Sequence, residues 1–487
     1  MMQAAVSEPV WQQVNRLRKA GDLPGAWNTG FAGLAENPQN RYLRGALFWV
    51  CYDYLKGFLQ PIMLRGQQNS GYRPSDREYR DIEGILEVIG QLQIPTGGFE
   101  YSRLLVLFRK NMDCFPTLIR LVMQHQDDLF NDEDKMPYVS DRGELPSLML
   151  NCVRKVALAW QSFGKHWQLP LSDVLALLDR ARGECRDIQH KLWLDYDQAR
   201  CLVMAGKNRE AREFILPVLR RKQSESWAWG ALASTYRQDD SEAAVILFAK
   251  GIGCAVNDQF SIPLLKGIAP LLMTQGKSRE GSLFIKKLVH IYQSQEWAVK
   301  QNIIELTQNS GYDQSVDLAE LPSVITQLSA KALTYLHGPT RQCVGVVERC
   351  HQSGKGFEVY LSQRETLSVR LGLHQQASGQ RKLPSPGDYV TLTLAEPEPG
   401  CFEVVASGNS EPVDMDGVET LTGILRVNPK GFGFVEDTFV PPFLLPKGMD
   451  GQRVTVIRIK SVDRKKQTIG WKAIHLGPDE GISAGIG

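Results

Sequence analysis

The chain has 487 residues, with a hydrophobic fraction of 43% and a charged fraction of 23%, which are ordinary values for globular proteins. At about 150 residues per domain, this length predicts two to four domains. A net charge of only +2 excludes a chain-wide basic surface for nucleic acid or membranes, so any such surface must be local.

Cysteine usage and hydropathy predict a cytoplasmic protein. The nine cysteines are scattered, odd in number and without a CxxC pair, a pattern typical of a reducing compartment. No apolar run approaches the roughly 18 residues that a membrane-spanning helix needs. The first residues also lack the basic-then-apolar order of a signal peptide.

Residues 1–335 predict α-helices joined by short polar turns, with the clearest internal order over 191–293. Three small residues at comparable positions lie 34 and 36 residues apart, namely Ala199, Ala233 and Ala269. A period near 34, with small residues where paired helices cross, indicates a helix-turn-helix solenoid. Glycines at the turns, Gly206 and Gly276, favour the left-handed conformation that ends a helix. These residues resemble tetratricopeptide repeats, and a further copy surrounds Gly21.

From residue 340 onward, helical periodicity gives way to short β-rich runs separated by glycine and proline turns. Two such units are predicted, at 340–408 and 421–475, with a polar linker at 409–420 and a disordered tail at 476–487. Five short strands per unit, with glycine-assisted bends, fit a small Greek-key barrel of the oligonucleotide-binding type. The predicted fold class is therefore multidomain α + β, an N-terminal α-helical solenoid followed by two small OB/cold-shock-like β-barrels.

The second β unit contains the run KGFGFV, in which Phe432 and Phe434 alternate onto one face of a strand. The following strand brings Phe439 alongside. Such an aromatic stripe can stack unpaired bases, at roughly 1–3 kcal/mol per base. Residues 421–475 carry ten basic and four acidic side chains, a balance of +6 that is suited to neutralising phosphates.

The stretch GILRVNPKGFGFVEDTFVPP resembles the cold-shock domain, specifically the version at the front of ribonuclease II and ribonuclease R enzymes. The resemblance implies stacking of single-stranded RNA or DNA, with RNA favoured. Two departures from bacterial cold-shock proteins, Val427 before the asparagine and Pro441 after the second motif, fit the ribonuclease-type variant. The first unit has the related run KGFEVY, where Val359 replaces the second aromatic, which implies weaker binding or a packing role. The nucleic-acid-binding residues predicted in this way are Arg426, Asn428, Lys430, Phe432, Phe434, Phe439, Lys355 and Phe357.

No catalytic, cofactor or metal motif stands out, so we expect a non-enzymatic protein. The metal-binding aspartates of the ribonuclease catalytic domain have no counterpart, and no phosphate-cradling glycine loop is present. The acidic segment 125–135 lacks the ligand alternation of a calcium loop. Cys343, Cys350 and His351 are better explained as strand residues than as zinc ligands. The run at 463–467 predicts a solvated hairpin turn, with phosphate binding as the alternative.

These features predict an adaptor or sensor that binds single-stranded nucleic acid and recruits a protein partner, such as an effector enzyme, through its solenoid. The domain order and the KGFGF motif also resemble accessory proteins of bacterial antiphage conflict systems of the TOTE type. The first alternative is a protein–protein scaffold subunit whose barrels bind protein rather than nucleic acid. The second is a divergent enzyme with a site among the helices of 100–190.

Overall fold

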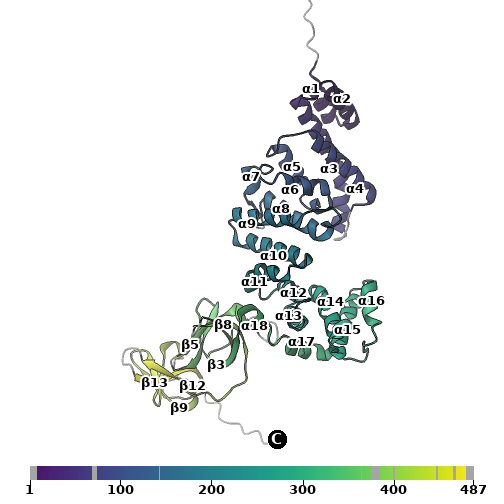
Figure 1. Ribbon diagram of the computed structural model, residues 1–487. Coiled ribbons are helices and arrows are strands. Elements are labelled where there is room, and N and C mark those ends of the chain that lie inside the picture. The colour runs from purple at the N-terminus through teal and green to yellow at the C-terminus, as the bar shows by residue number, and fades with distance from the viewer. Residues whose placement is uncertain are drawn as a thin grey trace, which may run out of the picture. The chain divides into compact units, whose positions relative to one another are not determined.

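The computed structural model describes residues 8–68, 74–141, 143–363, 365–375, 383–398, 401–445, 448–463 and 468–478. The chain divides into two compact units, Met1–Ser329 and Ala330–Gly487. The first is built from helices and the second mainly from strands (Figure 1). The predicted fold class is confirmed: a helical, solenoid-like region is followed by a closed β-barrel and a curled β-sheet.

The helical unit consists of successive helices joined by short turns. Their bounds are α1 (Val10–Lys19), α2 (Leu23–Glu36), α3 (Arg41–Gln68), α4 (Asp76–Gln91), α5 (Phe99–Phe108), α6 (Pro116–Gln124), α7 (Asp132–Lys135), α8 (Leu148–Phe163), α9 (Leu171–Glu184), α10 (Ile188–Met204), α11 (Asn208–Arg221), α12 (Ser226–Ser234), α13 (Ser241–Gly253), α14 (Asp258–Thr274), α15 (Ser278–Ser294), α16 (Gln301–Thr307) and α17 (Leu321–Ser329). A short hairpin, β1 (Tyr138–Ser140) with β2 (Gly143–Leu145), interrupts them and was not expected from the sequence. Within the described residues, no helix has both the length and the apolar character needed to cross a membrane.

The predicted repeats appear as the helix pairs α10–α11, α12–α13 and α14–α15. Each of the three spaced alanines lies on the first helix of its pair, and its exposed fraction is 2% or less. Gly206 and Gly276 adopt φ values of +79° and +76°, and the next residue donates back to the helix, from Lys207 N to Leu202 O and from Lys277 N to Leu272 O. Glycine without a Cβ tolerates this left-handed turn, which ends each first helix.

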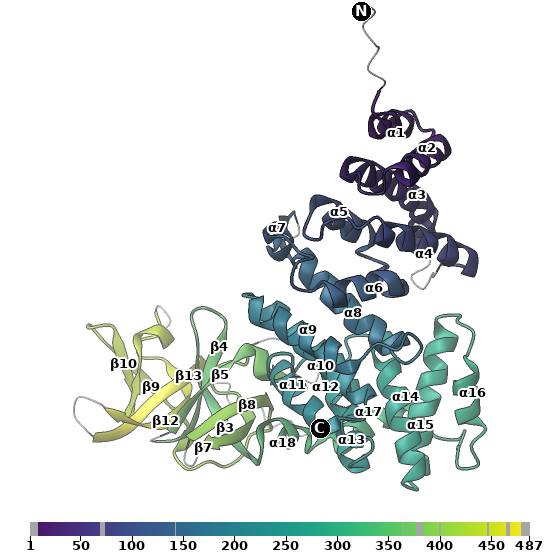
Figure 2. The ribbon, with the colours of Figure 1, turned by 45° about the horizontal axis from the view of Figure 1, so that its top comes forward.

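The β-rich unit begins with α18 (Ala332–His337) and contains two sheets that lie side by side (Figure 2). The first sheet has the strand order β5-β4-β3-β7-β8-β6, from β3 (Thr340–Cys350), β4 (Gly356–Ser362), β5 (Glu365–Arg370), β6 (His374–Gln375), β7 (Tyr389–Glu398) and β8 (Cys401–Asn409). The second is a closed barrel with the order β10-β11-β13-β12-β9, from β9 (Val418–Asn428), β10 (Phe432–Val435), β11 (Thr438–Val440), β12 (Arg453–Asp463) and β13 (Thr468–Pro478).

Each sheet has its own apolar core, and a third cluster joins them. The first sheet packs around Phe357, Val359 and Leu392, and the barrel packs around Leu425 and Val435. The third cluster contains two residues from each sheet, with exposed fractions of 2% or less: Val346, Tyr360, Ile459 and Ile474. The outer face of the barrel at β12 and β13 is therefore covered by the first sheet.

Several predicted features lie partly or wholly outside the described residues. The hairpin turn expected at 463–467 is described only at its first residue, and the tail expected at 476–487 only as far as Pro478, which still belongs to β13. The basic residues Lys447, Arg464, Lys465 and Lys466, which contributed to the predicted charge of 421–475, are also outside this part of the chain.

Candidate nucleic-acid interface

Three phenylalanines of the barrel form one partly exposed cluster, which we call the phenylalanine platform: Phe432, Phe434 and Phe439. Their ring centroids lie 5.8 Å (Phe432 to Phe434), 5.8 Å (Phe432 to Phe439) and 6.0 Å (Phe434 to Phe439) apart. Phe434 is directly opposite Phe439 in the ladder between β10 and β11, and it is 40% exposed. Neighbours on one strand face point the same way, so the three rings share the outer surface of the barrel.

The glycines of this stretch explain how the platform is held. Gly433 lies between the two phenylalanines and is buried, and a Cβ there would come within 3.1 Å of the Arg426 carbonyl oxygen and of the Leu445 side chain. Gly431 has φ +86° in the turn that precedes β10. The Asn428 side chain closes this turn, because its Oδ1 accepts a hydrogen bond from the Lys430 amide at 2.9 Å. Asn428 was predicted to contact nucleic acid, and here its side-chain oxygen also has a structural role.

Two cations border the platform. Arg426 is directly opposite Phe434 in the ladder between β9 and β10, and Lys430 lies in the turn beside Phe432. Both side chains are exposed, and neither forms a recorded ion pair with another described residue. They are thus placed to meet phosphates of a strand whose bases lie on the rings.

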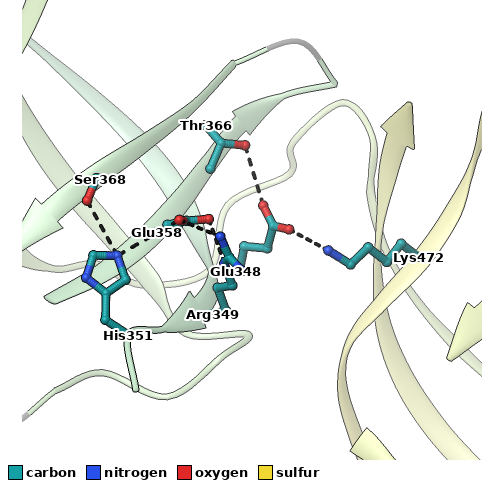
Figure 3. A network of polar contacts seen from close by, with 7 residues as sticks. All are labelled: Glu348, Arg349, His351, Glu358, Thr366, Ser368 and Lys472. Carbon is teal, nitrogen blue, oxygen red and sulfur yellow. Dashed lines mark hydrogen bonds and ion pairs between the residues drawn. The ribbon is translucent and has the colours of Figure 1, made fainter. Parts of the chain in front are cut away.

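Other cations of the barrel are already engaged by carboxylates. Arg458 donates to Glu419 at 2.6 Å and to Asp437 at 2.7 Å, and its guanidinium carbon lies 4.1 Å from the ring centroid of Trp471. Its side chain is only 13% exposed, so it stabilises the barrel. Lys472, in register with Phe439, donates to Glu348 of the first sheet at 2.6 Å (Figure 3). The positive charge counted from the sequence is therefore partly neutralised within the fold.

The first sheet differs from the prediction made from its KGFEVY run. Phe357 is fully buried in the core of that sheet, with its ring 5.2 Å from the buried His374 ring, so it is not available for stacking. Burial lowers the pKa of His374, whose Nδ1 lies 2.7 Å from Ser407 Oγ. Lys355 is exposed in the turn before β4, whereas the phenylalanine two residues later is buried.

A one-residue shift in register accounts for this difference. In the barrel a Cβ on Gly423 would contact Val435, and in the first sheet a Cβ on Gly345 would contact Val359. Gly345 and Gly423 hold equivalent positions, because each lies two residues before the strand partner of its valine, Val347 opposite Val359 and Leu425 opposite Val435, so Val359 is the counterpart of Val435. Glu358 therefore takes the place of Phe434. A shift of one residue moves each side chain of a strand to the other face, which explains why the matched phenylalanine enters the core.

The face of the first sheet that corresponds to the platform is polar and contains paired carboxylates (Figure 3). Glu358 accepts two hydrogen bonds from Arg349, from Nε and from Nη2, each at 2.8 Å. This guanidinium holds the pKa of the Glu358 carboxyl below its ordinary value. His351 lies near Glu358 at 3.9 Å and Ser368 at 3.5 Å. A bidentate pair of this kind presents no aromatic surface to a base, and its guanidinium is already occupied by a carboxylate.

The residues that were considered as possible calcium or zinc ligands have structural roles. Within the described residues, no group of three or more His, Cys, Asp or Glu side chains could hold a metal ion. In the acidic segment, Asp134 is buried and accepts a hydrogen bond from Ser102 Oγ at 2.6 Å. Cys343 and Cys350 pack against the core of the first sheet, and the Cys350 thiol donates to the Pro384 carbonyl at 3.1 Å.

Comparison with known proteins supports part of the resemblance seen in the sequence. Residues 419–476 match the family described as S1/CSD-like domain 2 of the TOTE conflict systems. The barrel is therefore similar to the S1/CSD-like domains of the TOTE conflict systems. The specific similarity to ribonuclease II and R enzymes stays a prediction.

Three further comparisons give less information. Residues 192–332, which include most of the predicted repeats, match a domain of unknown function (DUF7017). No curated protein matches the chain. Among solved structures, the chain is similar to human IFIT1 in its dimer with m7Gppp-AAAA, at 13% identity over 68% of this chain and 89% of that chain. The TM-score is 0.25, which is too low to support an inference about fold or function.

The structure also shows an aromatic residue that the sequence reasoning did not use. Phe443 is 69% exposed in the short 3₁₀ helix Pro442–Leu444, directly after the strand that carries Phe439. No ring contact is recorded between Phe443 and the platform. The two prolines that precede it end the strand alternation, and this removed the signal by which its position could have been predicted.

Proposed function

We propose that the barrel binds single-stranded nucleic acid on the phenylalanine platform. The observation that carries this proposal is the mutual contact of three partly exposed rings on an S1/CSD-like domain, bordered by Arg426 and Lys430. Every base has a π-face, so such a platform accepts many sequences, and the two cations supply phosphate contacts. The cold-shock and ribonuclease-type resemblance of this stretch favours RNA over DNA.

The same proposal makes the chain a non-enzymatic adaptor or sensor in a bacterial antiphage system of the TOTE type, located in the cytoplasm. The match of residues 419–476 to a domain of TOTE conflict systems supports this assignment. The helical repeats would recruit a protein partner, such as an effector enzyme, because stacked helix pairs present long surfaces for protein contacts. The first sheet takes no part in stacking and instead packs against the barrel.

The test is fluorescence anisotropy of the full chain with single-stranded RNA, single-stranded DNA and duplex. Its key variant is the double substitution Phe432→Ala with Phe434→Ala. We expect single strands to bind better than duplex and the double variant to lose about 2 kcal/mol, or roughly thirtyfold in affinity. Phe443→Ala is the matched control, since it removes an equally aromatic but more exposed side chain of the same barrel.

Failure of this experiment would favour the scaffold alternative. The apolar cluster between the first sheet and the barrel shows that at least one barrel face already binds a protein surface. If single strands do not bind, or if the double variant binds like the wild type while remaining folded, the platform does not stack bases and the nucleic-acid proposal for this face is wrong. Thermal unfolding of each variant separates loss of contact from loss of fold.

A further inference from the structure

A second aromatic pocket lies in the helical unit, far along the sequence from the barrel. It has a volume of about 320 Å³, at the lower end of the range for ligand pockets, and opens between α2, α3 and α4. Its lining contains three aromatic side chains, Trp27, Tyr54 and Phe58, and one charged side chain, Asp81. The remaining lining residues, Pro24, Asn28 and Ile85, carry no charge.

The aromatic rings form two sides of the pocket, Trp27 on one side and Tyr54 with Phe58 on the other. Trp27 stands almost perpendicular to Tyr54, with an interplanar angle of 88° and a centroid separation of 5.8 Å. Phe58 follows one turn later on the same helix as Tyr54, at 6.4 Å and 22°, and so extends that side. All three side chains are half-buried, so each keeps surface that a ligand can cover.

The charge at this pocket is negative. Asp81 lies exposed at the rim of the pocket, and its ion pair with the more exposed Arg77 on the same helix is long, at 3.9 Å. Burial raises the pKa of Tyr54, and the carboxylate of Asp22, at the start of α2, raises it further. Among the described residues, no lysine or arginine lines the pocket. Aromatic faces carry negative quadrupole charge, so rings and carboxylates here attract the same kind of ligand.

We propose that this pocket binds an alkylammonium group, such as the trimethylammonium head of a small molecule or a methylated lysine side chain. Such a cation presents apolar methyl groups to the rings while its charge is attracted to their faces and to Asp81. An anion would be repelled by Asp81, and a neutral apolar group would leave that carboxylate unused. The site is independent of the phenylalanine platform and of the nucleic-acid proposal.

The first experiment compares choline with 3,3-dimethylbutan-1-ol, which has the same shape but no charge. Saturation-transfer NMR of the N-methyl resonance, on the full chain at constant ionic strength, gives the dissociation constant of choline. We expect choline to bind about tenfold or more tightly than the neutral isostere. Equal binding of the two, or no choline signal, would overturn the proposal, because the pocket would then be merely apolar or closed.

Variants locate the site. Tyr54→Leu keeps the apolar bulk but removes one aromatic face, and we expect choline to bind about five- to tenfold more weakly. Asp81→Asn changes an exposed residue with little risk to folding and should weaken binding about threefold. Glu87→Gln, an exposed acid on the same helix outside the lining, is the matched control and should bind choline like the wild type. If Asp81→Asn behaves like Glu87→Gln, the rim carboxylate does not recognise the cation.

A third arm distinguishes the two sources of this chemistry. N-acetyl-Nε-trimethyllysine amide is titrated in the same way as choline. Tighter binding of the lysine derivative assigns the pocket to a protein side chain, and equal or tighter binding of choline assigns it to a free small molecule. Both results support an alkylammonium site, and absence of binding by both contradicts it.

Discussion

Neutralising the two cations beside the phenylalanine platform tests whether this face binds phosphate. The variant is Arg426→Gln with Lys430→Gln. Both side chains are exposed and lie at the platform, whereas Arg458 and Lys472 are occupied by carboxylates. The double variant therefore removes two exposed cations beside the platform without breaking an ion pair that the described residues form.

The expected magnitude follows from counterion release. Each phosphate neutralised on a single strand contributes about 0.7 to the slope of log affinity against log salt. Loss of two contacts should therefore make this slope shallower by about 1.4. Over a fourfold rise in salt concentration, the wild type should lose about sevenfold more affinity than the variant.

The assay is anisotropy of a labelled single-stranded RNA with the full chain, across salt concentrations of about 50–200 mM. Phe434→Ala is the comparison, because loss of a stacking ring should lower affinity at every salt concentration and leave the slope unchanged. Lys355→Gln on the first sheet is the charge control and should change neither quantity. An unchanged slope in the double variant, or an equal change in Lys355→Gln, would refute the assignment of the phosphate contacts.

Two further outcomes follow from the structure. Glu348→Gln should release Lys472 beside the platform, so that the slope of log affinity against log salt becomes steeper by about 0.7 and the affinity for single strands rises. A loss of affinity would instead mean that this ion pair holds the barrel in its binding geometry. Alkylation of the native protein, read out by mass spectrometry, should modify the exposed Cys401 and spare Cys51 and Cys201, because burial raises the pKa of both buried thiols to about 12 and leaves about one thiolate in ten thousand at pH 8. Rapid labelling of either buried cysteine would show that the helical unit opens.

The sequence predicted the barrel and its platform because the relevant signals are local. Phe432 and Phe434 are two residues apart on a strand, and Phe439 follows after a tight turn, so alternation alone places them together. The left-handed turns at Gly206 and Gly276 were likewise predictable from spacing and from the absence of a Cβ. In the platform and in these turns, the local geometry is determined by residues that lie within the sequence motif itself.

The first sheet could not be predicted in the same way, because its register depends on distant pairing. The KGF run matched the barrel in letters, but Val359 packs on Gly345, and this contact moves Glu358 to the outer face. The pairing of Glu348 with Lys472 joins residues 124 positions apart, and no local pattern indicates it. The sequence charge of the barrel therefore overstated the positive surface that remains available.

Because only the barrel carries the phenylalanine platform, its affinity for single-stranded nucleic acid is limited to what this one surface supplies. A nucleic-acid strand that crosses the platform from Phe434 to Phe439 would next reach Lys472, which is paired with the carboxylate of Glu348 from the first sheet. Three rings at about 1–3 kcal/mol per stacked base give about 3–9 kcal/mol before the cost of ordering the strand. This range corresponds to dissociation constants from about 6 mM to about 0.3 μM. Tight binding would thus require a second contact on the same nucleic-acid strand. The effector that we propose the helical repeats recruit would supply one if it also binds nucleic acid, because recruitment raises the effective concentration.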